Sequence, residues 1–441
     1  MAQQATRFYG WTLVGMFFGI YFLNATFPYV GASVINSYMA ESIGITKSIV
    51  GLGFSLFVLS SALSGPLVAY CVNKKGIRFT LASGGLIVAF GALLMALTVS
   101  KGWQYVLTFG VVIGTGVGLG TVIPIQTGVT NWFVRRRALA MSIALSAAGF
   151  GSFIAAPLLN KIIAASNGNW KNGWLVVVAT GLAAATIAAG GVRNTPASMG
   201  QFPDGVPPGK SSENTARNAQ VRSSRIYQSS EFWPVREVLK TKIFWLIIIA
   251  SFSFLAVFNT CVAHGVIHLR SLGHSPQFAA LSAGLLLLCS VGGKLFAGIL
   301  GDRIEPRFIL SAAVFSTLLG AVALANATNT AVVYLYACCV GVGFGASFVA
   351  MPTILANYYG VKSFAPLMGV ALPLTNGGSA IAPLLAGIVY DRFGSYVLAL
   401  YGGATIALLG AILVLFAKPP VSNAVVTVES KLDDKIGADF S

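Results

Sequence analysis

Charged side chains are scarce in this sequence. Only 9% of its 441 residues are Asp, Glu, Lys or Arg, against about 25% in a typical soluble domain. This scarcity excludes a soluble globular protein, and a mean hydropathy of +0.80 excludes a soluble domain with a single hydrophobic anchor. The apolar residues must instead fill many segments of about 20 residues, the length that spans a bilayer as a helix. We therefore expect an all-α membrane protein.

Acidic residues and cysteines are also few. The 12 acidic residues are outnumbered by 28 basic ones, but the basic residues fall in loops between apolar runs, as is typical of cytoplasmic loops. The excess of positive charge therefore does not predict a nucleic-acid partner. The five cysteines lie in or beside apolar segments and indicate neither a disulfide framework nor a metal site. We expect no metal and no cofactor.

Twelve stretches are long and apolar enough to be transmembrane helices. We place them at roughly 11–35, 48–72, 79–99, 104–131, 138–164, 173–192, 243–267, 277–301, 308–327, 331–358, 364–389 and 396–417. A polar stretch rich in Pro, Ser, Asn and Arg separates the sixth from the seventh and predicts a linker. The expected units are a six-helix bundle at 1–192, a cytoplasmic linker at 193–242, a second six-helix bundle at 243–418 and a cytoplasmic tail at 419–441.

The two halves of the chain repeat each other. The segment at 72–79 matches the one at 301–308, and the Ala-Pro-Leu-Leu motif at 156–159 recurs at 382–385, at nearly the same sequence offset. Such a parallel repeat predicts two halves of equal orientation with a substrate site between them near the bilayer midplane. With both termini in the cytoplasm, most Lys and Arg residues fall on the cytoplasmic side, which favours that orientation.

Several motifs carry a family resemblance. The segment at 65–78 resembles the signature loop after the second helix of major facilitators, although Asn73 and Lys74 replace its usual acid and Arg. The second-half copy keeps both, as Asp302 and Arg303. Five further motifs resemble the branch of monocarboxylate transporters and oxalate:formate antiporters. They lie at 8–11 (FYGW), 131–140 (NWFVRRRALA), 198–205 (SMGQFPDG), 382–387 (APLLAG) and 391–396 (DRFGSY). The resemblance implies the major facilitator fold and transport, not an enzyme.

Lys294 is the one basic residue that we place deep inside a span, since Lys161 falls near the end of the span at 138–164 and is counted with the loop outside. It lies eight residues before Asp302, about 12 Å along a helix, which puts it near the midplane of a hydrocarbon core about 30 Å thick. A charge there costs at least about 2.5 kcal/mol, and every acidic residue falls in a loop, the linker or the tail. We predict that Lys294 binds a substrate carboxylate, and the alternative is a snorkelling side chain. The family carries an Arg here, often with an Asp four residues earlier, where this chain has Ser290.

The remaining candidates depend more on the resemblance. The antiporter branch has a Lys where Asn376 aligns, and the single remaining cation favours a monoanion over a dianion. The family often has a His at the position of His264, so this residue is predicted to bind substrate or carry a proton, and the alternative is a structural hydrogen bond. Four further residues lie in spans that usually line the cavity, although each could serve helix packing instead: Asn259, Gln126, Tyr29 and Phe348.

These observations lead to one expected function. We expect a secondary active transporter of small organic carboxylates, with monocarboxylates favoured, that works by alternating access with proton symport. His264 and Lys294 are the proton-coupling candidates. Carboxylate exchange of the oxalate:formate type and efflux of other small molecules are the alternatives. We expect a multi-pass monomer in the cell (plasma, or inner) membrane, with the lipid bilayer and the carboxylate substrate as its partners, and with a proton as the partner in symport.

Overall fold

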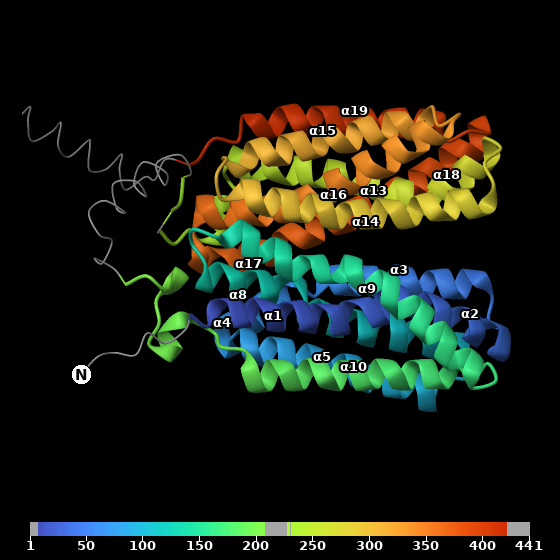
Figure 1. The fold of residues 1–441 in the computed structure, drawn as a ribbon, viewed down its shortest axis with the longest axis horizontal. Helices are drawn as coiled ribbons and strands as arrows, with labels where there is room; N and C mark the ends of the chain where they lie inside the picture. The colour runs from blue at the N-terminus through green and yellow to red at the C-terminus, as the bar shows by residue number, and fades with distance from the viewer. Residues whose placement is uncertain (1–7, 208–226, 230, 421–441) are drawn as a thin grey trace, which may run out of the picture.

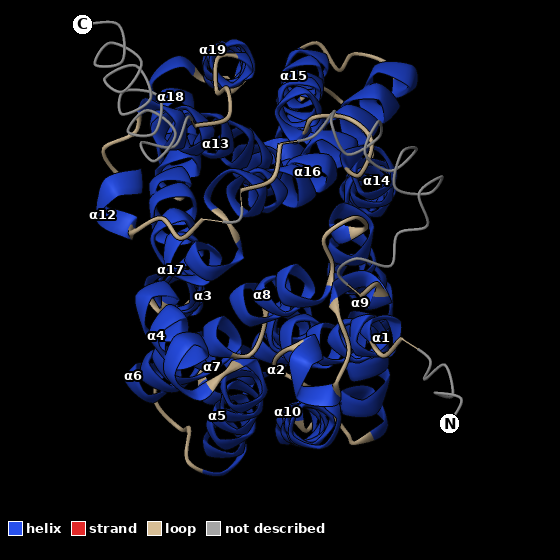
Figure 2. Cartoon of the chain, turned by 90° about the vertical axis from the view of Figure 1, so that its left-hand side faces the viewer, coloured by secondary structure: helices blue, strands red, loops and turns tan. Residues whose placement is uncertain are grey.

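The computed structural model describes residues 8–207, 227–229 and 231–420. Within these ranges the chain is helical and contains no strand (Figure 1; Figure 2). This follows from the solvent, because in hydrocarbon every backbone polar group must be bonded within its own segment or within a closed barrel. The expected all-α class is confirmed.

The first half of the chain forms a bundle that lies below in Figure 1, which we call the N-bundle. Its elements are α1 (Gly10–Tyr21), the π-helix η1 (Phe22–Gly31), α2 (Ala32–Ile43), α3 (Lys47–Leu63), α4 (Gly65–Lys75), α5 (Ile77–Leu97), α6 (Gly102–Tyr105), the π-helix η2 (Val106–Ile113), α7 (Gly114–Leu119), α8 (Val122–Trp132), α9 (Arg137–Ala165) and α10 (Trp170–Gly191).

The second half forms the C-bundle, which lies above in Figure 1. Its elements are α13 (Lys242–Ser271), α14 (Pro276–Gly301), α15 (Pro306–Ala325), α16 (Thr330–Tyr359), α17 (Val361–Leu372), the π-helix η5 (Pro373–Gly377), α18 (Ile381–Phe393) and α19 (Val397–Leu415). In the described residues between the bundles the chain forms three short helices: η3 (Pro196–Met199), η4 (Pro203–Gly205) and α12 (Val235–Val238).

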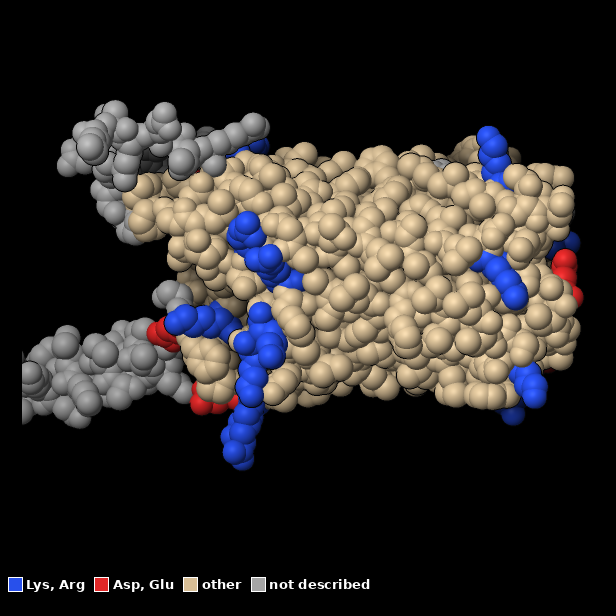
Figure 3. All heavy atoms as spheres, turned by 90° about the horizontal axis from the view of Figure 1, so that it is seen from below, with Lys and Arg blue, Asp and Glu red and all other residues tan. Residues whose placement is uncertain are grey.

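The helices account for the predicted number of spans. Eleven in the described residues are long and apolar enough to cross a membrane, and α3 with α4, bent by 42° at Ser64, forms a twelfth. The first span is longer than predicted, since it continues through polar residues to Ile43 and ends where Gly44 adopts a left-handed φ of 68°. The eleventh also extends further, to Phe393. Figure 3 shows a broad face without charged side chains between the two ends of the molecule.

One end of the molecule carries the linker, and we call it the linker end. It lies on the left in Figure 1, where the described chain also begins and ends. The linker is tied to the N-bundle there, because the Asp204 carboxylate accepts hydrogen bonds from the backbone N–H groups of Val134 (3.1 Å) and Arg135 (2.8 Å). Helix α9 of the N-bundle packs against α14 of the C-bundle, and α4 packs against α17. These contacts hold the two bundles side by side.

Candidate substrate-binding cavity

A cavity of about 370 Å³ lies between the two bundles. The N-bundle lines it with residues of η1, α3, α7, α8 and α9, and the C-bundle with residues of α13, α14, α16, α17 and η5. The wall is mostly apolar and aromatic, with a few polar side chains, which is the usual composition of a small-molecule site. Five residues predicted from the sequence line this cavity: Lys294, Ser290, Asn376, Tyr29 and Phe348.

Lys294 lies on α14 with only 4% of its surface exposed. Its Nζ is 5.7 Å from the ring centroid of Phe348 and 5.9 Å from that of Phe344, both on α16. These distances allow cation–π attraction, which offsets part of the cost of burial. Among the described residues no atom accepts a hydrogen bond from Nζ, and the cavity wall contains no Asp or Glu. Its three N–H donors are therefore available to an anion that enters the cavity.

Ser290 lies one turn before Lys294 on the same helix. Its hydroxyl donates to the backbone carbonyl of Leu287 at 2.6 Å, so the proton is used within α14 while the oxygen can still accept. Asn376 belongs to η5, where Pro373 begins a short π-helical segment in the middle of the eleventh span. This local widening interrupts the regular α-helix at cavity depth, as π-helical segments often do at functional sites.

A second, smaller hollow adjoins the cavity beside Asn376. It has a volume of about 20 Å³ and is lined by Gln126 and Ser347, among others. Gln126 Oε1 and Ser347 Oγ are buried without a hydrogen-bond partner in the part of the chain that the structure describes. A space of this size and polarity is suited to one water molecule. Gln126 is thus placed next to the main cavity but not in its wall.

Two predicted residues face away from the cavity. Asn259 of α13 donates from Nδ2 to Ser379 Oγ at 3.1 Å. His264 of the same helix has its Nε2 at 2.9 Å from the backbone carbonyl oxygen of Pro383, and its ring stacks on Tyr396 with centroids 4.8 Å apart. In this conformation both side chains join α13 to the region of α18 and α19.

The structure also brings in residues that the sequence reasoning missed. Phe344 and Phe258 line the cavity, with their rings stacked at a centroid distance of 3.7 Å. Thr26 of η1 lines it too, and its hydroxyl is buried without a partner. Phe344 lies one helical turn before Phe348, so the i, i+4 spacing was an available signal. Nothing in the sequence singles out Thr26 or Phe258.

The cavity is closed towards the linker end. Hydrogen bonds join the bundles on this side of the cavity. Arg137 Nη1 donates to Asn357 Oδ1, the Asp302 carboxylate accepts from the N–H groups of Ala138 (2.9 Å) and Leu139 (3.2 Å), and Thr353 Oγ1 donates to Met141 Sδ at 3.8 Å. Towards the opposite end, Tyr29 in the cavity wall is 44% exposed. We call this arrangement the linker-end-closed state.

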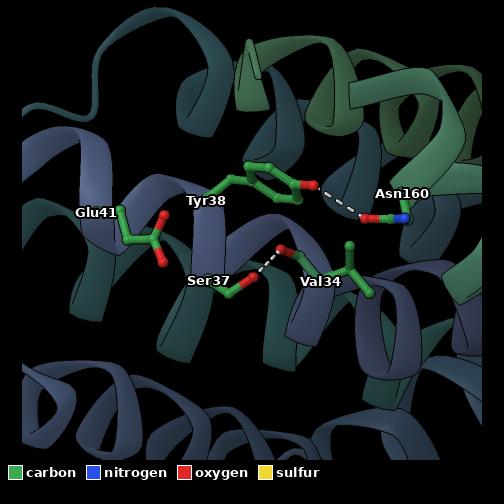
Figure 4. A pocket seen from close by; sticks show the side chains of 5 residues that line it. All are labelled: Val34, Ser37, Tyr38, Glu41 and Asn160. Carbon is green, nitrogen blue, oxygen red and sulfur yellow. Dashed lines mark hydrogen bonds between the residues drawn. The ribbon is translucent and has the colours of Figure 1, made fainter. Parts of the chain in front are cut away.

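A separate hollow lies on the N-bundle between α2 and α9 (Figure 4). Tyr38 Oη donates to Asn160 Oδ1 at 3.0 Å, and Ser37 Oγ donates to the carbonyl oxygen of Val34 at 2.7 Å. The remaining residue is Glu41, whose carboxylate forms no hydrogen bond to the others (Figure 4). A carboxylate in this position repels an anion, so the hollow does not resemble the anion-compatible cavity around Lys294.

Comparisons with solved structures agree on the architecture. The chain aligns with the Escherichia coli fucose:proton symporter at a TM-score of 0.67 and 14% identity, covering 92% of this chain and 98% of that one. It aligns with a proton:xylose symporter at a TM-score of 0.70 and 12% identity, covering 93% and 97%. At these identities the likeness concerns the fold alone.

Sequence comparisons place the chain among transporters. Rat monocarboxylate transporter 12 is 25% identical over 81% of this chain and 74% of its own length. Bovine monocarboxylate transporter 13 is 26% identical over 78% and 74%, and an uncharacterized transporter of Escherichia coli is 22% identical over 83% and 84%. The Major Facilitator Superfamily profile matches residues 16–325 and 265–436. The chain belongs to the major facilitator superfamily, in its monocarboxylate transporter-like branch, and is a membrane transporter.

Proposed function

We propose that this transporter carries small organic carboxylates, with monocarboxylates favoured, by alternating access coupled to protons. The observation that carries the proposal is Lys294, a buried cation between the bundles without an acceptor among the described residues. A buried cation without a counter-ion is costly, and a substrate carboxylate would supply the missing charge. The relatives described as monocarboxylate transporters support the same substrate class.

The cavity wall favours a small carboxylate with a short substituent. One cation matches one carboxylate, and Asn376 and Ser290 offer hydrogen-bonding groups to a polar substituent. The aromatic side chains around Lys294 suit an apolar one. A cationic substrate is disfavoured because it would be repelled by Lys294.

Proton coupling needs a group that binds and releases a proton during the cycle. No described residue of the cavity wall is a carboxylate, which leaves Lys294, His264 or the substrate itself. Lys294 is better placed than His264, because it lines the cavity in this conformation. Exchange of one carboxylate for another, without net proton movement, remains the second mechanism and uses the same binding site.

Replacement of Lys294 tests the substrate assignment. Lys294→Ala should abolish uptake of labelled monocarboxylates into proteoliposomes while the protein still folds, because the change removes a buried charge without leaving its partner unpaired. Lys294→Arg should keep part of the activity with altered affinity, since Arg retains the charge but has a planar fork. Ligand at 100 times its dissociation constant should stabilise the wild type by about 2.7 kcal/mol and Lys294→Ala by far less.

The control removes an equivalent charge elsewhere. Lys171 is exposed on α10, away from the cavity, and Lys171→Ala should transport like the wild type. Normal uptake by Lys294→Ala would refute the carboxylate role of this residue and favour efflux of other compounds. A panel of carboxylates tested with and without a pH gradient would separate symport from exchange, because only symport accumulates substrate against its gradient in response to protons.

A further inference from the structure

A cavity of about 420 Å³ lies at the linker end, outside the substrate cavity, where the N-bundle meets the start of α17. We call it the lysine pocket. Lys74 and Lys75 at the end of α4 and Lys362 in the first turn of α17 line it, together with the amide side chains of Asn73, Asn131 and others. Among the residues that the structure describes, the lining contains no Asp or Glu. Three lysines from the two bundles thus line one space, to which no described acidic residue contributes.

The internal repeat shows what is missing from this pocket. In the second half, the Asp302 carboxylate accepts hydrogen bonds from Ala138 and Leu139 in the first turn of α9, across the interface between the bundles. The repeat aligns Asp302 with Asn73, and the helix that faces Asn73 in the pocket is α17. Asn73 is neutral, and among the described residues no side chain accepts from the first-turn N–H groups of α17. The first half of the chain therefore has the lysine pocket at the position where the second half has the Asp302 carboxylate.

Two of the lysines that line the pocket also lie beside exposed aromatic rings. Lys74 Nζ lies 5.2 Å from the ring centroid of Tyr70, and Lys75 Nζ lies 5.7 Å from that of Phe79. These two rings are 56% and 50% exposed, on helices that span the membrane. Exposed aromatic side chains beside lysines at the end of a span are typical of the membrane–water interface. An acyl chain could lie against these rings while its headgroup reaches the lysines.

We propose that the lysine pocket binds a phosphate-bearing anion, supplied by the headgroup of an anionic phospholipid, which bridges the two bundles. The phosphate replaces the carboxylate that Asn73 lacks and accepts from Lys74, Lys75 and Lys362. It relieves the repulsion between the lysines of the N-bundle and Lys362 of the C-bundle. Because the pocket is assembled from both bundles, the anion stabilises the linker-end-closed state. Basic pockets between spans are known sites for anionic headgroups.

The test compares lipid compositions on the full chain. The protein is reconstituted in nanodiscs of phosphatidylcholine alone or with phosphatidylglycerol, and spin-label distances across the linker end report the closed fraction. Phosphatidylglycerol should raise the ratio of closed to open state in the wild type by roughly tenfold, as expected for a few lysines near an anionic surface. Inorganic phosphate added to phosphatidylcholine nanodiscs separates a soluble anion from a lipid: an equal effect of phosphate would overturn the lipid assignment.

Three variants make the test specific. Lys74→Gln combined with Lys75→Gln and Lys362→Gln should lose the response to phosphatidylglycerol. The matched control, Lys240→Gln with Lys242→Gln and Arg303→Gln, removes the same charge from exposed positions at the linker end and should keep the response. Asn73→Asp should be closed in phosphatidylcholine alone and should no longer need the anionic lipid. An unchanged response in the pocket variant, or equal loss in the control, would overturn the proposal.

Discussion

Helix α14 and the residue that follows it carry two charged side chains in different surroundings. Lys294 lies in the substrate cavity with aromatic rings around it, whereas Asp302, just after the end of the helix, is held by two backbone N–H groups of α9. The carboxylate already has partners within the protein, and the ammonium has none among the described residues. This difference makes Lys294 the candidate for substrate binding and Asp302 a candidate for control of the linker-end-closed state.

Asp302 should make the linker-end-closed state dependent on pH. Burial raises the pKa of its carboxyl from 3.8 to about 6, against the opposing effects of the Ala138 and Leu139 N–H groups and of Arg137, while Asp204 adds to the rise. A raised pKa means that Asp302 binds its proton more tightly in the closed state than in an open state where the carboxyl is exposed to solvent. Protonation of Asp302 should therefore stabilise the closed state fully below pH 3.8, and this stabilisation should be lost as the pH rises through about 6. Spin-label distances across the linker end, measured over this range, should show the change.

A neutral side chain at the same position is the control for Asp302. Asp302→Asn cannot ionise, so its closed fraction should not vary with pH over that range. If this variant keeps the wild-type pH dependence, the titrating group is not Asp302 and the prediction is wrong.

His264 should reveal whether a proton is carried outside the cavity. We expect His264→Ala to reduce proton-driven accumulation more than equilibrium exchange, because only net symport must load and release a proton. The two rates are measured in the same proteoliposomes. His274→Ala is a suitable control, since that ring also bonds to a backbone carbonyl, at Ala327. Equal loss of both activities in His264→Ala would mean that the His264–Pro383 contact is structural.

At the scale of elements, the crossing of α4 and α17 depends on two glycines. A Cβ on Gly369 would lie 2.8 Å from the carbonyl oxygen of Gly65 and 2.9 Å from Cβ of Ala69. Small residues allow such close approach of helices in lipid. Because one of these neighbours is backbone, the helices themselves would have to move apart.

Gly369→Ala should therefore destabilise the linker-end-closed state. Overpacking of this kind costs about 1–3 kcal/mol, which corresponds to a shift in population of at least roughly fivefold towards the open state. Spin-label distances and the rate of transport would both report it. Gly15→Ala has the same gain in helix propensity but no neighbour within 4 Å, so it should behave like the wild type. Identical distances in both variants would show that the crossing does not limit closure.

At the scale of the whole molecule, the distribution of basic residues predicts which side of the membrane the linker end faces. We predict the cytoplasm, because most basic residues lie in the loops of that end. A cysteine introduced at Ser212, which lies outside the described residues, should resist impermeant thiol reagents in intact cells. A cysteine at Asn167, exposed between α9 and α10 at the other end, should react. The reverse pattern of labelling would place both termini outside.

Much of the fold could be predicted without coordinates. In hydrocarbon the backbone must satisfy its own hydrogen bonds, as a helix does, so the lengths of the apolar stretches predicted twelve helical spans. The repeated motifs predicted two equivalent halves. The depth of Lys294 followed from counting residues along a helix, and the cavity does contain it. Errors were confined to helix ends, as at Ile43 and Phe393, where helices extend beyond the apolar core.

The sequence by itself thus determined the class of protein, the number of spans and the position of a buried cation, Lys294, which has no acidic partner among the described residues. It could not determine which face of each helix meets the cavity, because a membrane helix is apolar on nearly all sides and has little amphipathic pattern to read. For this reason the sequence could not distinguish Asn259 and His264 from residues such as Tyr29 that line the cavity. The packing of α13 against the region of α18 and α19 shows that Asn259 and His264 face away from it. The lysine pocket likewise exists only in the tertiary structure, since its three lysines come together only when the two bundles meet.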